Sequence, residues 1–125
     1  MRTGAALVAS IALIAGAAAS AAPAAPGRYE GELCVATRSD APPSCGAADV
    51  EVARGPVVVV RVADIVYRLA LGTGRLDLQT MHGRMEIDEF SAAYSWQGTT
   101  LRFQDPDKDV RYEVRIGARK TGTPS

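Results

Sequence analysis

Apolar residues recur at every second position from Tyr29 onward, and this alternation limits the fold more than any other feature of the sequence. Tyr29, Leu33 and Val35 share one phase, while Glu30 and Glu32 take the other. Successive side chains of a β-strand point to opposite faces, so a period of two is typical of a strand with one buried and one wet face. The three-and-four spacing of an amphipathic helix is not sustained anywhere in the sequence. The alternation predicts an all-β chain.

Turn sequences divide the alternating stretches into about eight or nine strands. Glycines that tolerate a positive φ are expected to form turns at Gly72-Thr73-Gly74, His82-Gly83 and Gln97-Gly98, and Asp105-Pro106-Asp107-Lys108 is typical of a type I turn. No connection is long enough for a parallel crossover. The strands are therefore expected to form an antiparallel meander.

Two stretches give further expectations about which strand faces are buried. The valine run 57–62 predicts a strand that is covered on both faces. Met85 and Ile87 alternate with Glu86 and Asp88, which predicts that the two apolar side chains of this strand are buried.

A meander of about eight short strands fits a closed or partly open β-barrel better than a two-sheet sandwich. Closure removes the edge strands, and sequential hairpins need no Greek-key crossing. We expect a single β domain over residues 29–116, preceded by a flexible segment at 22–28 and followed by a disordered tail at 117–125.

The first 21 residues have the order of a cleaved signal peptide. Arg2 precedes an apolar run from Ala5 to Ala19, and the small residues that follow fit cleavage after Ala21. The run is too short and too rich in alanine for a membrane anchor, and no cysteine stands directly after the cleavage site, so we expect no lipobox. We expect a periplasmic or secreted protein that begins at Ala22, with no transmembrane segment in the mature chain.

Size and charge exclude several classes of function. Removal of 21 residues from 125 leaves 104, which is enough for one modest core but not for a second domain. The mature chain carries 13 basic and 14 acidic side chains with the signs interspersed, since Arg2 is the one charged residue removed. Nucleic acid and anionic membrane surfaces are therefore not expected as partners.

The two cysteines predict a disulfide. Cys34 and Cys45 flank the stiff segment Ala41-Pro42-Pro43-Ser44, and export would place them in an oxidising compartment. Their spacing is not that of a redox-active C-x-x-C pair, and a zinc site would need more ligands than a chain with one histidine offers. We expect a structural bridge, no metal and no cofactor.

Three groups of polar residues are candidates for catalysis or metal binding, and each also fits an ordinary structural role. His82 lies at a predicted turn near Glu86 and Asp88, where a hydrolytic base would need an orienting partner. Asp105, Asp107 and Asp109 start a calcium-loop pattern, but Val110 and Ile116 replace the glycine and glutamate that complete it. Asp88 and Glu89 are adjacent on a strand and point to opposite faces, so they cannot flank one glycosidic bond.

Aromatic residues gather in the second half of the chain. At alternating positions they are more typical of a barrel core than of a binding platform. If they face outward, Tyr94 and Trp96 are the residues expected to anchor a protein partner.

These features favour an exported, non-catalytic module that binds or inhibits another protein, such as one of the bacterial envelope, or senses an envelope component. A barrel that carries a small molecule is an alternative, since eight strands can enclose one ligand. A hydrolase built around His82 is a second alternative.

Overall fold

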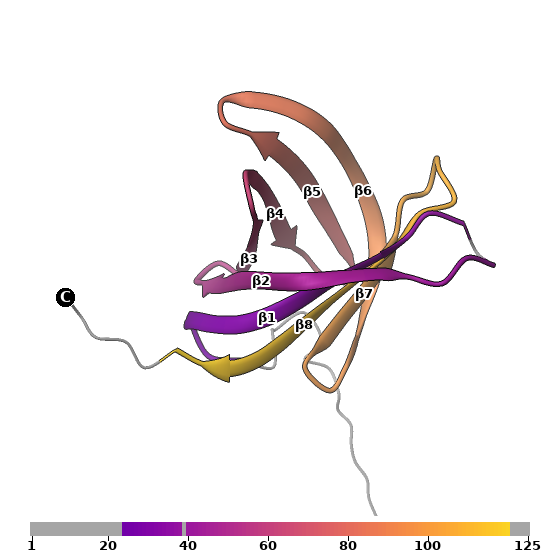
Figure 1. The fold of residues 1–125 in the computed structure, drawn as a ribbon. Coiled ribbons are helices and arrows are strands. Elements are labelled where there is room, and N and C mark those ends of the chain that lie inside the picture. Colours follow the sequence, from indigo (N-terminus) through magenta and orange to yellow (C-terminus); the bar gives the residue numbers. More distant parts are fainter. Residues whose placement is uncertain (1–23, 39, 121–125) are drawn as a thin grey trace, which may run out of the picture.

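The structure is a computed structural model that describes residues 24–38 and 40–120, and within these ranges it contains eight strands and no helix. Each strand pairs with the next in antiparallel fashion, and the last strand pairs with the first (Figure 1). The expected all-β meander and its closure into a barrel are confirmed. The strands are β1 (Gly27–Ala36), β2 (Ser44–Ala53), β3 (Val57–Val62), β4 (Ile65–Leu71), β5 (Arg75–His82), β6 (Met85–Gln97), β7 (Thr100–Gln104) and β8 (Arg111–Arg119).

The apolar phase of the strands fills the barrel interior. Burial of these side chains removes apolar surface from water, which is the main term that favours the fold. The largest of them are at most 1 % exposed, so no water-sized sphere reaches them from outside or from within. They are Val50, Val58, Val60, Leu69, Leu76, Leu78, Leu101 and Val114.

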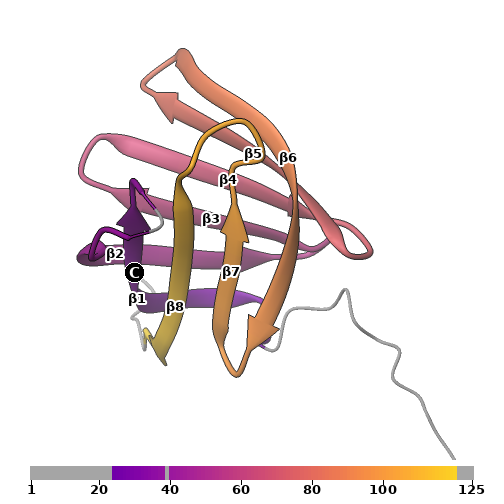
Figure 2. The same cartoon turned by 90° about the vertical axis from the view of Figure 1, so that its right-hand side faces the viewer.

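The two walls of the barrel cross at a steep angle. Strands β7 and β8 run across β2 and β3 on the opposite wall (Figure 2). On β3, Val58 and Val60 point into the core, and Val59 on the outer face is also buried between its cross-strand neighbours Glu51 and Arg68. The valine run is thus covered on both faces, in agreement with the sequence.

The turns combine expected glycines with one residue that carries no turn signal. Gly83 and Gly98 take φ values of 64° and 62°, which glycine adopts at no steric cost. Ala63, in the turn between β3 and β4, takes a φ of 52°. A residue with a Cβ rarely adopts this left-handed conformation, so the identity of Ala63 did not indicate it.

Closure of the barrel depends on Gly31 in β1. The register of β1 against β8 shifts between Tyr29 and Gly31. A Cβ at Gly31 would lie 2.5 Å from Val50 Cγ2 and 2.7 Å from the carbonyl oxygen of Arg115. Only a residue without a side chain lets β8 approach β1 this closely.

The paired strands extend further at both ends than the sequence suggested. β1 begins at Gly27, within the segment expected to be flexible, and β8 continues through Arg119, beyond the expected start of the tail at Gly117. Arg119 lies over the ring of Tyr29, 5.6 Å from its centroid, and the Lys120 N–H donates to the Arg28 carbonyl. These contacts between the two ends explain why the pairing continues there.

The expected signal peptide at 1–21 and the last residues of the tail at 121–125 lie outside the described residues. Within the described residues, no helix is long and apolar enough to cross a membrane.

Candidate binding surface around the β5–β6 hairpin

Strand β6 is much longer than the strand that follows it. It has 13 residues, whereas β7 has 5. β6 pairs with β5 along most of its length but with β7 only from Tyr94 to Gln97. The β5–β6 hairpin therefore projects beyond the rest of the barrel, as Figures 1 and 2 show at the top of each view.

The tip of this hairpin exposes two large apolar side chains. Met85 is 64 % exposed and Ile87 is 50 % exposed, and they are the exposed large hydrophobic residues among those described. The prediction that both are buried is wrong. The β5–β6 register shifts between Thr80 and Met81, so β6 has one extra residue there. Beyond this bulge the inward-facing positions of β6 are the even-numbered ones, starting at Asp88.

An aromatic cluster lies beneath the line where β6 separates from β7. The rings of Phe103 and Tyr112 stack with centroids 4.9 Å apart, and Phe90 of β6 lies 6.2 Å from Phe103 and 5.9 Å from Tyr112. Phe90 and Phe103 are buried and Tyr112 is partly buried. Side-chain packing thus joins β6 to β7 and β8 where their backbones do not pair.

A charged group joins the β7–β8 loop to β6 above this cluster. Lys108 Nζ lies 3.6 Å from Asp88 Oδ2 and 3.9 Å from Asp105 Oδ2. Asp105 is almost fully buried, and its other carboxylate oxygen accepts the Asp107 backbone N–H at 2.8 Å. Burial, with a smaller contribution from the nearby Asp88 carboxylate, raises the pKa of Tyr112 to about 12.

The outer face of the β5–β6 hairpin is acidic. Glu86, Glu89 and Asp77 lie there, and the Glu86 carboxylate raises the pKa of Glu89 by like-charge repulsion. Gln79 donates to Glu86 at 2.8 Å, and the Ser91 hydroxyl donates to Asp77. On the neighbouring strand β4, Arg68 is opposite Gln79 in the register and lies beside Asp77 and Glu89, so the surface combines these carboxylates with one cation.

The predicted disulfide lies on the outer face of the barrel. Cys34 on β1 and Cys45 on β2 are directly opposite each other in the register and are bonded. Both sulfurs are used in the bridge, so the grouping of Glu32 with the two cysteines offers no thiolate to a metal. The bridge is structural in this arrangement.

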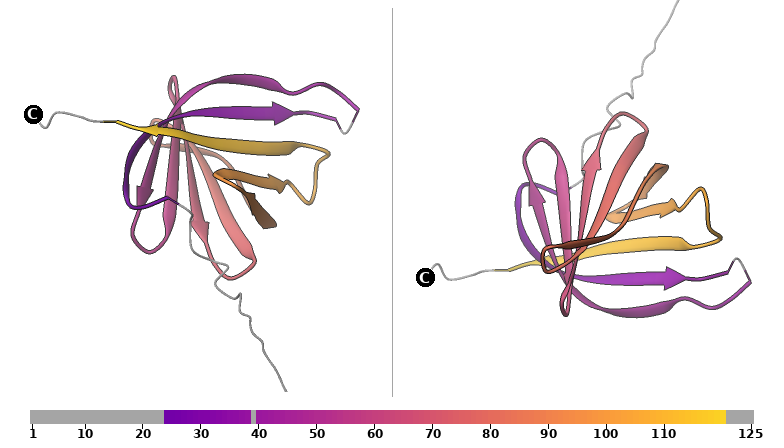
Figure 3. Two further views of the ribbon diagram at one scale, coloured as in Figure 1. Left: turned by 90° about the horizontal axis from the view of Figure 1, so that it is seen from below. Right: turned by 90° about the horizontal axis from the view of Figure 1, so that it is seen from above.

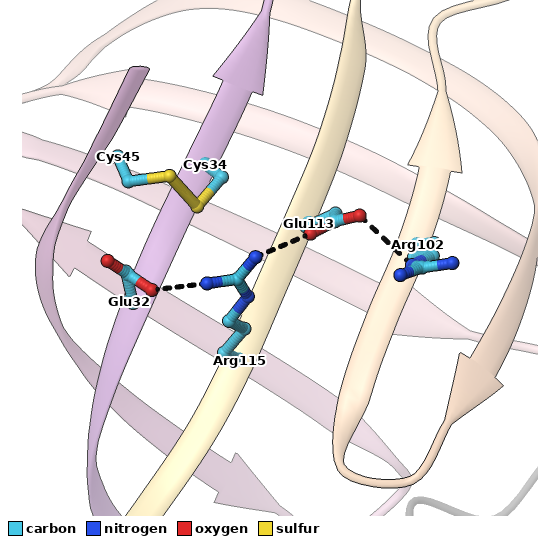
Figure 4. A network of polar contacts seen from close by, with 6 residues as sticks. All are labelled: Glu32, Cys34, Cys45, Arg102, Glu113 and Arg115. Carbon is cyan, nitrogen blue, oxygen red and sulfur yellow. Dashed lines mark hydrogen bonds and ion pairs between the residues drawn. A yellow bond between two sulfur atoms is a disulfide. The ribbon is translucent and has the colours of Figure 1, made fainter. Parts of the chain in front are cut away.

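A chain of ion pairs crosses the strands beside the bridge (Figure 4). Arg115 contacts Glu32 at 2.8 Å and Glu113 at 3.1 Å, and Glu113 contacts Arg102 at 3.0 Å. Next to it lies a half-open hollow of about 290 Å³, lined by Cys34, Ala36, Pro43, Gln104 and Arg111 among others. The β1–β2 and β7–β8 loops flank it and lie side by side (Figures 1 and 3). Its charged lining consists of Arg102, Arg111 and Glu113, of which Arg102 and Glu113 pair with each other.

Tyr94 and Trp96, the residues expected to anchor a partner, are partly buried and pack against the core. The Tyr94 hydroxyl donates to the Gly72 carbonyl at 2.6 Å. Trp96 Nε1 is buried and has no hydrogen-bond partner within the described residues. A binding role for this pair stays a prediction, and any such surface would be limited to the exposed parts of the two rings.

The other sequence candidates are not brought together. His82 Nε2 lies 3.9 Å from Asp64 Oδ2, whereas Glu86 is bound by Gln79 and Asp88 by Lys108. Asp88 and Glu89 lie on opposite faces of β6, as their adjacency predicted. In the 105–109 segment, Asp105 is buried while Asp107 and Asp109 are exposed. The three aspartates therefore do not share one environment.

The exposed hairpin tip was missed by reasoning from sequence, although the sequence contains a signal for it. Met85 and Ile87 occupy odd positions, whereas Ala92, Tyr94 and Trp96 occupy even ones. A change of phase inside one strand requires an extra residue, which is a β-bulge. The change of phase marks where the apolar side chains turn away from the core.

Comparison with known proteins gives no relative. No family model matches the chain, and neither a curated protein nor a solved structure matches it.

Proposed function

We propose that this chain is a non-catalytic module that binds another protein through the projecting β5–β6 hairpin. The observation that carries the proposal is the exposure of Met85 and Ile87, at 64 % and 50 %, on a hairpin that extends beyond the barrel. Exposed apolar side chains rimmed by polar residues are typical of protein contact sites. The rim here includes Glu86 on β6, Arg84 in the turn and His82, which is opposite Met85 in the register.

The filled interior supports this proposal over a carrier. Side chains such as Leu69, Leu78 and Leu101 occupy the middle of the barrel and are at most 1 % exposed. A carrier needs a cavity of several hundred cubic ångströms with an apolar lining. The hydrolase alternative has less support, because His82 faces Asp64 rather than Glu86 or Asp88.

We further propose that the mature protein acts in the periplasm or outside the cell, with a protein of the bacterial envelope as its partner. The order of the first 21 residues and the bonded cysteine pair support this location. Mass spectrometry of the native protein tests it, and the expected N-terminus is Ala22. An intact Met1 in the folded product would contradict export.

Site-specific photo-crosslinking tests the binding surface. A benzophenone amino acid at position 85 is expected to give one discrete adduct in the cells that make the protein. The matched control carries the same group at Thr73, an exposed position on the β4–β5 turn. Ile87→Ser should lower the adduct yield about tenfold, which corresponds to a loss of about 1.4 kcal/mol of binding free energy.

Two outcomes would overturn the proposal. One is the absence of an adduct from position 85. The other is the same set of adducts from positions 85 and 73, since this would mean that the hairpin tip makes no specific contact.

A further inference from the structure

The hydrogen-bond ladder on one side of β6 ends halfway along the strand. β7 pairs with β6 from Gln97 to Tyr94 and no further, although β7 itself continues to Gln104, which pairs with Arg111 of β8. Within the described residues, no strand pairs with this side of β6 from Met85 to Ala93. The barrel thus keeps one open strand edge.

The phase of the ladder shows which backbone groups face this edge. The Tyr94 N–H donates to the Gly74 carbonyl on the β5 side. Backbone groups of an antiparallel strand point to alternate sides, so those of Ala92 and Phe90 also face β5. The N–H and C=O groups of Glu89, Ser91 and Ala93 face away from β5, toward the open edge.

Two further observations agree with this assignment. The Glu89 N–H donates to Asp88 Oδ1 at 2.9 Å, as expected for a backbone group that no strand partner uses. Ser91 and Ala93 are exposed and short, and the Ser91 hydroxyl is directed across to Asp77 of β5. The side chains of Ser91 and Ala93 themselves are therefore too short to cover the backbone at the centre of the edge.

We propose that this edge of β6, from Glu89 to Ala93, receives an extended segment of a partner protein as an added strand, and that the segment carries lysine or arginine toward the outer face. This inference rests on the proposed binding function and specifies its mode. Strand addition uses main-chain hydrogen bonds for affinity and alternate side chains for specificity.

The charge of the hairpin determines the kind of segment. Glu89 lies at the edge on the outer face, Glu86 lies beside it toward the hairpin tip, and Asp77 lies one strand away on β5. Repulsion from the other two carboxylates raises the pKa of Glu89. A basic segment relieves this repulsion, whereas a second copy of the chain would bring the same carboxylates to the edge. Charged residues at an edge also prevent indiscriminate pairing, so the acidic border selects among partners.

The inner face of the edge sets the other half of the specificity. Phe90 and the stacked pair of Phe103 and Tyr112 lie beneath it. Inward-facing residues of the added strand would contact these rings, which favours aliphatic side chains at the positions between the basic ones. The expected segment alternates basic and aliphatic residues.

Amide hydrogen exchange with two synthetic peptides tests the proposal on the full mature protein. The probes are capped hexapeptides, one alternating lysine with valine and the other alternating glutamate with valine. At a peptide concentration ten times its Kd, the lysine peptide should slow exchange of the Ser91 and Ala93 amides about tenfold. The glutamate peptide should leave these amides unchanged, and Glu86→Gln with Glu89→Gln should weaken binding of the lysine peptide.

A proline variant provides a second measurement. Ser91→Pro removes an N–H that faces the open edge and leaves the β5 ladder intact, so it should abolish protection of Ala93 by the lysine peptide. If this variant does not fold, the exchange data on the wild-type chain still decide the question. Protection by neither peptide, or equal protection by both, would overturn the proposal.

The test separates this inference from the proposed function. A crosslinked adduct from position 85 that is insensitive to Ser91→Pro, with no protection of Ser91 and Ala93, would retain the binding module and exclude strand addition. A dimer in sedimentation experiments that becomes monomeric in Ser91→Pro would assign the edge to a second copy of the chain and overturn the basic segment.

Discussion

The disulfide is the residue-scale feature with the clearest effect on stability. Cys34 and Cys45 are 11 residues apart and join β1 to β2. Opening this loop restores entropy to the unfolded chain, so Cys34→Ser or Cys45→Ser should lower the free energy of unfolding by about 2–4 kcal/mol. The far-UV circular dichroism of a β protein should persist, and both variants should behave alike. Wild-type melting temperatures in either variant, or two titratable thiols in the native protein, would contradict this role.

Tyr112 couples stability to alkaline pH. Burial raises its pKa to about 12 from an ordinary value of 10, so between these pH values the folded chain holds a proton that the unfolded chain has released. The stabilisation that this difference in pKa gives the folded chain is complete below pH 10, and it is lost as the pH rises toward 12. Denaturant unfolding across this range should show a decline in stability that is smaller in Tyr112→Phe. An equal decline in both proteins would assign the effect to other groups.

At the scale of single elements, the sequence predicts strands well and their ends poorly. The alternation in the stretch that forms β4, and the glycines after β5 and β6, place strands and turns because side-chain period and φ preference are local properties. The turn at Ala63 carries no such signal, because pairing of β3 with β4 imposes its conformation from outside. The extension of β8 to Arg119 likewise depends on Tyr29, which is 90 residues away.

The candidate site also has features that depend on distant parts of the chain and that the sequence does not predict. The bulge in β6 is recorded in the sequence as a change of phase between Ile87 and Ala92, but the open edge is not. Where the β6–β7 ladder ends depends on how far β7 follows β6 before it turns toward β8, and this is a property of barrel geometry. Alternating positions led us to expect aromatic residues such as Phe103 and Tyr112 in the barrel core, whereas their clustering with Phe90 beneath the edge was not expected.

Gly31 provides the element-scale prediction. Gly31→Ala places a Cβ against Val50 and against the backbone of Arg115, which cannot move without disturbing the β1–β8 pairing. We expect a loss of about 1–3 kcal/mol in the free energy of unfolding, measured by urea titration. Gly46→Ala is the matched control, because a Cβ there meets nothing within 4 Å and its effect should be within about 0.5 kcal/mol. Equal losses in the two variants would mean that closure does not depend on this close approach.

At the scale of the whole molecule, stability and the proposed binding depend on different parts of the barrel. A filled interior gives the barrel its stability, and the part of β6 that leaves the barrel gives it a surface for contact. The buried core draws side chains from all eight strands. Unfolding should therefore be a single cooperative transition.

The filled interior leads to a prediction that separates a binding module from a carrier. Leu78 is 1 % exposed at the centre of the barrel, so Leu78→Ala should leave a cavity and cost about 2–5 kcal/mol. An apolar cavity of this kind stays dry and binds small apolar molecules. Benzene should therefore raise the melting temperature of Leu78→Ala and leave that of the wild type unchanged. The control is Val66→Ala on the outer face, which should create no benzene site. If the wild-type protein binds benzene or the apolar dye N-phenyl-1-naphthylamine with 1:1 stoichiometry, its interior has room for a ligand, and a carrier would then be the better explanation of the fold.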